Sequence, residues 1–361
     1  MTRHNVRDAL QIFVLGSAVV YVYCGSDWKP EPTFIAWADS LPEGTVGDIA
    51  RWCSRHLCIF NNAGVAFARQ IKHNMQGHGA YLLGDVAPRS IWYYYPAALS
   101  IKLPLSLIVL PIALTSVKPK ALMNLATMLA LALLLFSLNC RVQIGIRLVL
   151  PIVVFLAIGS STALARLIGS EIDERRRRIV IITSVLSLTW LTVATITTWP
   201  QYLNYSNEAW GGPRQTYRHL SDSNSDWGQG LLELSDWARR RPTDEICVWY
   251  FGADPRVEGP PFVHMPVHAL PIRDETDLRN TVRGRMLAVS KTLLYGSYKL
   301  DPRVLAILSW LRQQSPMAET STFIIYELSP QTIHERAAGS VSAEAAVSIA
   351  PSAKTPIRRN F

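Results

Sequence analysis

The sequence is poor in charge for its length. Of its 361 residues only 17% are charged and 49% are hydrophobic, whereas an average soluble chain is roughly 25% charged. The mean hydropathy of +0.14 is too high for a disordered or nucleic-acid-coating protein and too low for a chain that lies wholly in a membrane. We therefore expect an apolar part over residues 1–200, a soluble part after it, and no nucleic-acid partner despite the net charge of +9.

Short signatures of common catalytic and metal sites are also missing. There is no Gly-rich phosphate loop, no Gly-x-Ser-x-Gly, no His-Glu-x-x-His and no Cys-x-x-Cys. Four residues fall at positions 1, 3, 5 and 12 of a calcium-binding loop, but Trp227 stands where that loop needs Gly; the four are Asp222, Asn224, Asp226 and Glu233. We expect no metal and no cofactor. The five cysteines leave two alternatives, a Cys53–Cys58 bridge or unpaired thiols.

Long apolar windows are what the sequence does contain. A membrane helix needs about 20 residues, and four windows approach or exceed that length, namely Ala97–Val117, Ala121–Leu138, Leu148–Ala165 and Ile179–Pro200. A shorter fifth window, Ala9–Tyr23, lacks the cleavage site of a signal peptide and is predicted to be a retained span. Buried core helices are the alternative. The predicted fold class is a multispan α-helical membrane protein with about five transmembrane helices in residues 1–200.

Positive charges between the windows predict the orientation. Arg175–Arg178, Lys118 with Lys120, and Arg3 with Arg7 all fall on one side if there are five spans, and such clusters mark the cytoplasmic side. The N-terminus is then cytoplasmic in an inner or plasma membrane. The outer loop 24–96, the short loop 139–147 and the C-terminal region lie outside.

The outer loop contains an expected amphipathic helix and an aromatic run. Within Asp48–Phe60, Ile49 and Trp52 fall on the side opposite Arg51 and Arg55; this helix either lies among lipid headgroups or packs on the protein. Trp92–Pro96 precedes the next span, as in the aromatic belt of a membrane interface.

Cations on the outer side call for a further explanation, because positive charge normally stays on the cytoplasmic side. A phosphate-bearing lipid would need such donors, with Arg offering bidentate geometry. The candidates for a carrier-phosphate site are His78, Tyr81, Lys102, Arg141 and Arg147. For Lys102, snorkelling to the interface is an equal alternative. Arg147 is our first choice since it is outward and adjoins a span.

Residues 201–335 are predicted to form a small extracytoplasmic domain of α/β or α+β type. Strands are expected at Ile246–Phe251, Met286–Ser290 and Phe323–Leu328, and helices from about Asp222 to Arg241 and over Pro302–Gln314. The Ala- and Ser-rich residues 336–361 are expected to be a disordered tail.

Several segments resemble one family, the membrane glycosyltransferases related to protein O-mannosyltransferases and lipid A aminoarabinose transferases (GT-C type). They are Gly77–Gly84, Trp92–Pro96 with Lys102–Pro104, Gln143–Pro151, Asn204–Pro213, Asp222–Gln229, Leu287–Ser290 with Leu294–Gly296, and Phe323–Tyr326. The most specific match is that of Asn204–Pro213 together with Asp222–Gln229. Together they span most of residues 1–330.

The resemblance implies an inverting transferase that takes a sugar from a polyprenyl-phosphate carrier on the outer membrane face. In that family an acidic residue of the first outer loop acts as general base. The acidic residues of loop 24–96 do not fall in that motif, and Gly230 stands where the family commonly has Asp. No catalytic residue is therefore assigned. We expect the chain to be the C-terminal part of such an enzyme, lacking the catalytic acidic loop, with a separate polypeptide supplying the N-terminal spans.

A function of another class remains open at this point. The chain would then be a non-catalytic membrane scaffold or partner subunit whose outer domain binds a glycan or a protein. The membrane and the lipid-linked sugar donor are the partners that the first hypothesis predicts.

Overall fold

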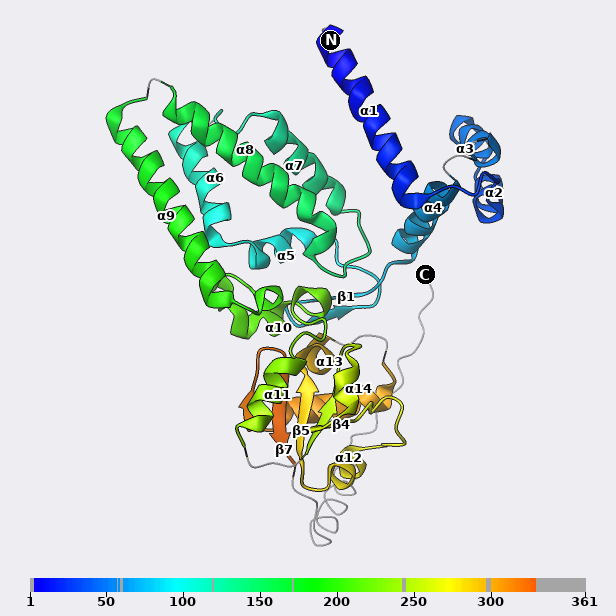
Figure 1. The fold of residues 1–361 in the computed structure, drawn as a ribbon, viewed down its shortest axis with the longest axis vertical. Helices are drawn as coiled ribbons and strands as arrows, with labels where there is room; N and C mark the ends of the chain where they lie inside the picture. Colours follow the sequence, from blue (N-terminus) through cyan, green and yellow to red (C-terminus); the bar gives the residue numbers. More distant parts are fainter. Residues whose placement is uncertain are drawn as a thin grey trace, which may run out of the picture. The chain divides into compact units, whose positions relative to one another are not determined.

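The computed structural model describes residues 3–328, except 57, 59–60, 119, 171, 242–244 and 297–299 (Figure 1). The chain divides into two compact units, and the expected tail 336–361 lies outside the described residues. Unit 1 comprises Met1–Gly79, Arg89–Trp92 and Asn139–Gln143; unit 2 comprises Ala80–Pro88, Tyr93–Leu138 and Ile144–Phe361. The segment after residue 200 is hydrogen-bonded to the helices before it, as described below.

Unit 1 is helical. Its elements are α1 (Arg3–Cys24), α2 (Pro32–Asp39), α3 (Thr45–His56) and α4 (Asn61–Gln76). α1 covers the apolar window predicted at Ala9–Tyr23. Helix α2 begins with Pro32, whose fixed φ suits the first turn of a helix.

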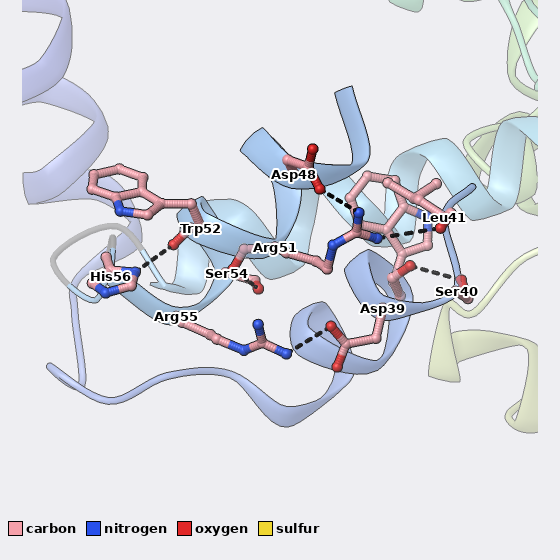
Figure 2. Close-up of polar contacts among 10 residues, drawn as sticks. Asp39, Ser40, Leu41, Asp48, Arg51, Trp52, Ser54, Arg55 and His56 are labelled. Atoms are coloured by element: carbon pink, nitrogen blue, oxygen red, sulfur yellow. Dashed lines mark hydrogen bonds and ion pairs between the residues drawn. The ribbon is translucent and has the colours of Figure 1, made fainter. Parts of the chain in front are cut away.

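The amphipathic helix expected at Asp48–Phe60 is α3, and its basic side packs on the preceding segment. Arg55 binds the carboxylate of Asp39 at 2.8 Å, while Arg51 binds Asp48 at 2.7 Å and donates to the carbonyl of Leu41 at 3.3 Å (Figure 2). These arginines are therefore paired within unit 1. The apolar side is exposed, with Ile49 at 58% and Trp52 at 57%. Leu57 and Phe60 of this prediction lie outside the described residues.

All five cysteines are free thiols, so the structure favours the second of the two cysteine alternatives.

Unit 2 begins with a short hairpin and a group of apolar helices (Figure 1). The hairpin strands are β1 (Ala80–Leu82) and β2 (Asp85–Ala87), and the helices are α5 (Tyr94–Lys102), α6 (Leu105–Val117), α7 (Leu125–Ser137), the 3₁₀ turn η2 (Ile146–Val149), α8 (Leu150–Ile168) and α9 (Glu174–Thr198). Helices α7 and α8 approach closely at Gly159, where a Cβ would lie 2.3 Å from Oγ1 of Thr127. Asn124 caps α7 and donates to the carbonyl of Gly159 at 3.0 Å.

The window Ala97–Val117, predicted as one span, is divided between two helices that together are long and apolar enough to cross a membrane. The helix breaks between α5 and α6 with a bend of 101°. Pro104 lacks a backbone N–H and disfavours helical φ and ψ in the residue before it, and Leu103 is accordingly extended at φ −76° and ψ 135°. α7 is also shorter than its predicted window; its 13 residues are about 20 Å long, where a bilayer core is about 30 Å thick.

Among the described residues, three helices are long and apolar enough to cross a membrane, or four if the bent pair counts as one. The three are Val6–Cys24, Ile146–Ile168 and Glu174–Thr198. This composition is compatible with a helical membrane protein.

Short turns connect α9 to the next domain of unit 2. They are η3 (Tyr202–Asn204), η4 (Glu208–Trp210), η5 (Pro213–Gln215), α10 (Thr216–His219) and η6 (Asp222–Asn224). The helix expected from Asp222 begins only at Leu231, as α11 (Leu231–Arg239). The earlier start was wrong because Asn224 and Asp226 bind backbone groups outside a helix and Gly228 has a φ of +88°.

A five-stranded mixed sheet forms the rest of unit 2, in the order β4-β3-β5-β7-β6. The strands are β3 (Ile246–Trp249), β4 (Phe262–His264), β5 (Met286–Ser290), β6 (Ala318–Glu319) and β7 (Phe323–Glu327). β3 pairs in parallel with β4 and β5, and β7 pairs antiparallel with β5 and β6. The three predicted strands are confirmed as β3, β5 and β7.

Helices cover both faces of this sheet. Alternate strand residues such as Cys247 and Leu287 pack with α12 (Glu275–Val282), α13 (Lys291–Gly296) and α14 (Pro302–Gln313), the last being the predicted helix. The intervening residues such as Val248 and Ala288 pack with α11 on the other face. The strands are apolar on both sides for this reason, which is why they appear in the sequence as continuous apolar runs.

Candidate functional site

Lys102 lies at the break between α5 and α6 and is only 8% exposed. Its ammonium group donates to three backbone carbonyls, those of Leu203 at 2.8 Å, Asn224 at 2.7 Å and Tyr205. A lysine has three N–H donors, so all of them are engaged. Lys102 therefore neither snorkels nor has a donor left for a phosphate in this structure.

Asn224 is the centre of a network that joins distant parts of unit 2. The residue is fully buried, its side chain donates to the hydroxyl of Tyr94 at 2.8 Å, and its Oδ1 accepts from the backbone N–H of Ile146 at 3.1 Å. Its carbonyl is one of the three that bind Lys102. Three segments far apart in the chain, around residues 94–102, 146 and 224, are held together by this one side chain and carbonyl.

Asn207 attaches the segment after α9 to the same place. Its side chain donates to the carbonyls of Ser100 at 2.7 Å and Leu103 at 2.8 Å, and its backbone N–H donates to Ile101 at 2.9 Å. The last carbonyls of a helix lack partners within the helix. Asn207 donates hydrogen bonds to these carbonyls at the end of α5.

Arg147 lies on the exposed side of this network. It follows Gly145, whose φ is +131° and where a Cβ would lie 2.5 Å from Oγ of Ser223, so the close approach of the two segments requires glycine. The guanidinium of Arg147 lies over the indole of Trp227, 5.2 Å from the ring centroid. Trp227 is 55% exposed. The pair forms a cation–π contact that presents a positive charge at the surface.

Asp226 is a buried acid next to this pair. It is 2% exposed, its Oδ1 accepts from Gly228 N–H at 2.8 Å, and its Oδ2 has no hydrogen-bond partner among the described residues. Burial raises the pKa of Asp226 to about 7, an effect that the Gly228 hydrogen bond and the charge of Lys291 partly oppose. No group of three or more His, Cys, Asp or Glu side chains in the described part of the chain is arranged to hold a metal.

The remaining sequence candidates do not join the network. Tyr81 lies in β1, is buried, and donates to the carbonyl of Arg218 at 3.0 Å; burial raises the pKa of its phenol to about 12. His78 and Arg141 belong to unit 1, where the backbone N–H of His78 donates to the carbonyl of Arg141 at 3.1 Å. Arg141 is exposed. The structure thus links Lys102 and Arg147 through Asn224, places Tyr81 elsewhere in unit 2, and places the other two in unit 1.

Sequence reasoning missed Asn207 and Asn224 as organising residues, although both lie in segments that it singled out. Their hydrogen-bond partners are mainly backbone groups, which are not specified by residue type and so cannot be recognised in the sequence. The sequence signal is limited to the serines beside the two amides, Ser206 before Asn207 and Ser223 and Ser225 on either side of Asn224.

No family model, curated protein or solved structure matches the chain. Its function is therefore inferred from its own residues and from the resemblance described above.

Proposed function

We propose that the chain is part of a membrane glycosyltransferase and that it binds the polyprenyl-phosphate carrier of a sugar at the outer face of the membrane. The observation that carries the proposal is the network around Asn224. It connects segments that each resemble the same transferase family, those of Tyr94 and Lys102, of Gly145 to Arg147, and of Asn207 and Asn224. Segments that act on one ligand are expected to be held together in this way.

The outer surface of the apolar helices supports a membrane location. Along α8 and α9, large apolar side chains are exposed, among them Val154 at 55%, Ile158 at 50%, Leu186 at 63% and Leu188 at 67%. In water such a surface would be an aggregation hazard, whereas in lipid it is the surface expected of spanning helices. We propose four spans, namely α1, the bent pair α5–α6 counted as one, α8 and α9, or five if the shorter α7 is included, with the sheet domain outside.

Arg147 is the residue of unit 2 that best suits the carrier phosphate. It is exposed, it begins the helical stretch Ile146–Ile168 that is long enough to cross a membrane, and its guanidinium offers the bidentate geometry that a phosphate accepts. The stacked Trp227 restrains the arginine and presents an aromatic ring at the same surface. Lys102, with its donors engaged, is assigned to holding the site together.

The test measures binding of a polyprenyl phosphate to the full chain in detergent micelles. Arg147→Gln is expected to weaken binding at least about tenfold, since a charge-assisted hydrogen bond contributes about 1.5–3 kcal/mol. Arg239→Gln is the matched control, because Arg239 is also an exposed arginine. Its ion pair with Asp236 has a long N–O distance of 3.8 Å. This variant should bind like the parent chain.

Equal binding by the Arg147 variant and the parent would remove the phosphate assignment. No binding by the parent chain would favour the alternative of a non-catalytic membrane scaffold.

A further inference from the structure

A pocket of about 700 Å³ opens at the end of α9, between α11 and the β6–β7 turn of unit 2. This volume is within the range of about 300–1,000 Å³ typical of small-molecule sites. Its wall combines two indoles with charged and amide side chains; the residues that matter here are Trp199, Gln201, Glu233, Asp236, Trp237 and Arg240.

We infer that this pocket binds an uncharged saccharide, the sugar carried by the lipid-linked substrate. Trp199 is 70% exposed and held edge-on to Tyr202 at 5.5 Å, so its ring face can pack on the apolar face of a pyranose. Trp237 packs against the core of the sheet, and the guanidinium of Arg241 lies over its ring, 4.3 Å from the ring centroid. Trp199 is thus the stacking ring and Trp237 part of the wall.

The polar groups of the pocket suit hydroxyls. Glu233 accepts a hydrogen bond from the backbone N–H of Ser321, and the charge of Glu319 is partly balanced by Lys291 at 3.2 Å. Asp236 and Arg240 are exposed at the rim, one accepting and one donating hydrogen bonds. Three lining carboxylates against one lining guanidinium disfavour an acidic sugar.

The position of the pocket connects it to the phosphate site, and in this respect the inference rests on the proposed function. Gln229 lines the pocket, and its side-chain oxygen accepts a hydrogen bond from the backbone N–H of Trp227 at 2.7 Å. The guanidinium of Arg147 in turn lies over the ring of Trp227. Trp199 ends a helix that is apolar and long enough to cross a membrane. A sugar attached to a lipid phosphate at Arg147 would therefore lie near this pocket and near the headgroup layer.

Saturation-transfer NMR on the full chain in detergent micelles tests the inference with the methyl glycosides of glucose, galactose, mannose and N-acetylglucosamine, and with methyl glucuronide. At least one neutral glycoside should receive saturation and the glucuronide none. Trp199→Ala and Asp236→Ala change exposed side chains, and each should weaken binding by about fivefold or more. Trp52→Ala, which removes another exposed indole, in unit 1, is the control and should change nothing.

Saturation of the glucuronide alone, of no glycoside, or to the same extent in all variants would overturn the inference. Polyprenyl-phosphate binding is measured on the same samples. If it persists while saccharide binding is absent, the pocket assignment fails and the proposed function stands; if it is absent as well, both fail.

Discussion

Lys102 shows how one buried cation can hold three chain segments in place. Moving an ammonium group out of water is costly unless its charge and its donors are matched by partners. Here the partners are carbonyls from two segments more than a hundred residues away, around Leu203–Tyr205 and at Asn224. A residue predicted from the sequence to bind a ligand therefore joins parts of the protein to one another.

Lys102→Met keeps the length of the side chain and removes its donors. Three carbonyls would lose a partner, one in a buried and two in partly buried hydrogen bonds, and at about 1–3 kcal/mol for a buried unsatisfied group the free energy of unfolding should fall by at least about 1 kcal/mol. The measurement is thermal or denaturant unfolding of the full chain in detergent. Lys120→Met, at an exposed loop position, should change stability by no more than about 0.5 kcal/mol. An unaltered Lys102 variant would show that the three hydrogen bonds contribute nothing.

Asp226 gives a pH dependence of stability. Its pKa is raised from 3.8 to about 7 in the folded chain by burial, so between these values the folded state holds a proton that the unfolded state has lost. Stability therefore falls as the pH rises from about 4 to about 7, by up to about 1.4 kcal/mol per pH unit, and this loss is complete above the folded pKa.

Asp226→Asn should remove this dependence while keeping the acceptor for Gly228 N–H. Unfolding curves at about pH 5, 6 and 7 would show the variant gaining stability over the parent as the pH rises. Asp236→Asn, a change of an exposed acid, is the comparison and should leave the slope unaltered. If the free energies of unfolding of Asp226→Asn and of the parent differed by the same amount at all three pH values, the raised pKa of Asp226 would be contradicted.

At the scale of helices and strands, the sequence predicted the ones that follow from a local pattern of residues. The strands β3, β5 and β7 were predicted because strands buried on both faces are continuous apolar runs, and α14 was predicted over Pro302–Gln314. In the structure, Asp301 caps this helix and Pro302 begins it. The start of α11 and the break before Pro104 were missed. Hydropathy averages over a window, so it does not register one proline. Asn224 is kept out of a helix by partners distant in sequence, Tyr94 and Ile146, and Asp226 by a local hydrogen bond from Gly228 N–H.

The candidate site was predictable in its segments and not in its geometry. Resemblance and outward charge pointed to the stretches around residues 94–102, 145–147 and 222–229, and the structure joins these stretches at Asn224. Which of the candidate side chains are exposed could not be foreseen. Burial separates Lys102 and Tyr81 from Arg147, and burial depends on tertiary packing of the carbonyls and rings around each residue.

At the scale of the whole molecule, the apolar helices, the basic–aromatic surface and the sheet domain would together serve the lipid-dependent function that we propose. The apolar exterior of α8 and α9 would place Arg147 where a membrane helix begins, and the pocket at Trp199 lies where another one ends. A lipid that carries a phosphate and a sugar has one part for each of these three environments.

The most direct measurement is photo-crosslinking of a polyprenyl phosphate, with the reactive group in its first isoprene unit, to the full chain in detergent micelles, followed by peptide mapping. The account predicts labelling in residues 144–151 and 222–229, reduced by excess unlabelled lipid and by Arg147→Gln. Labelling confined to other apolar surfaces, or labelling that the Arg147 variant leaves unchanged, would contradict it.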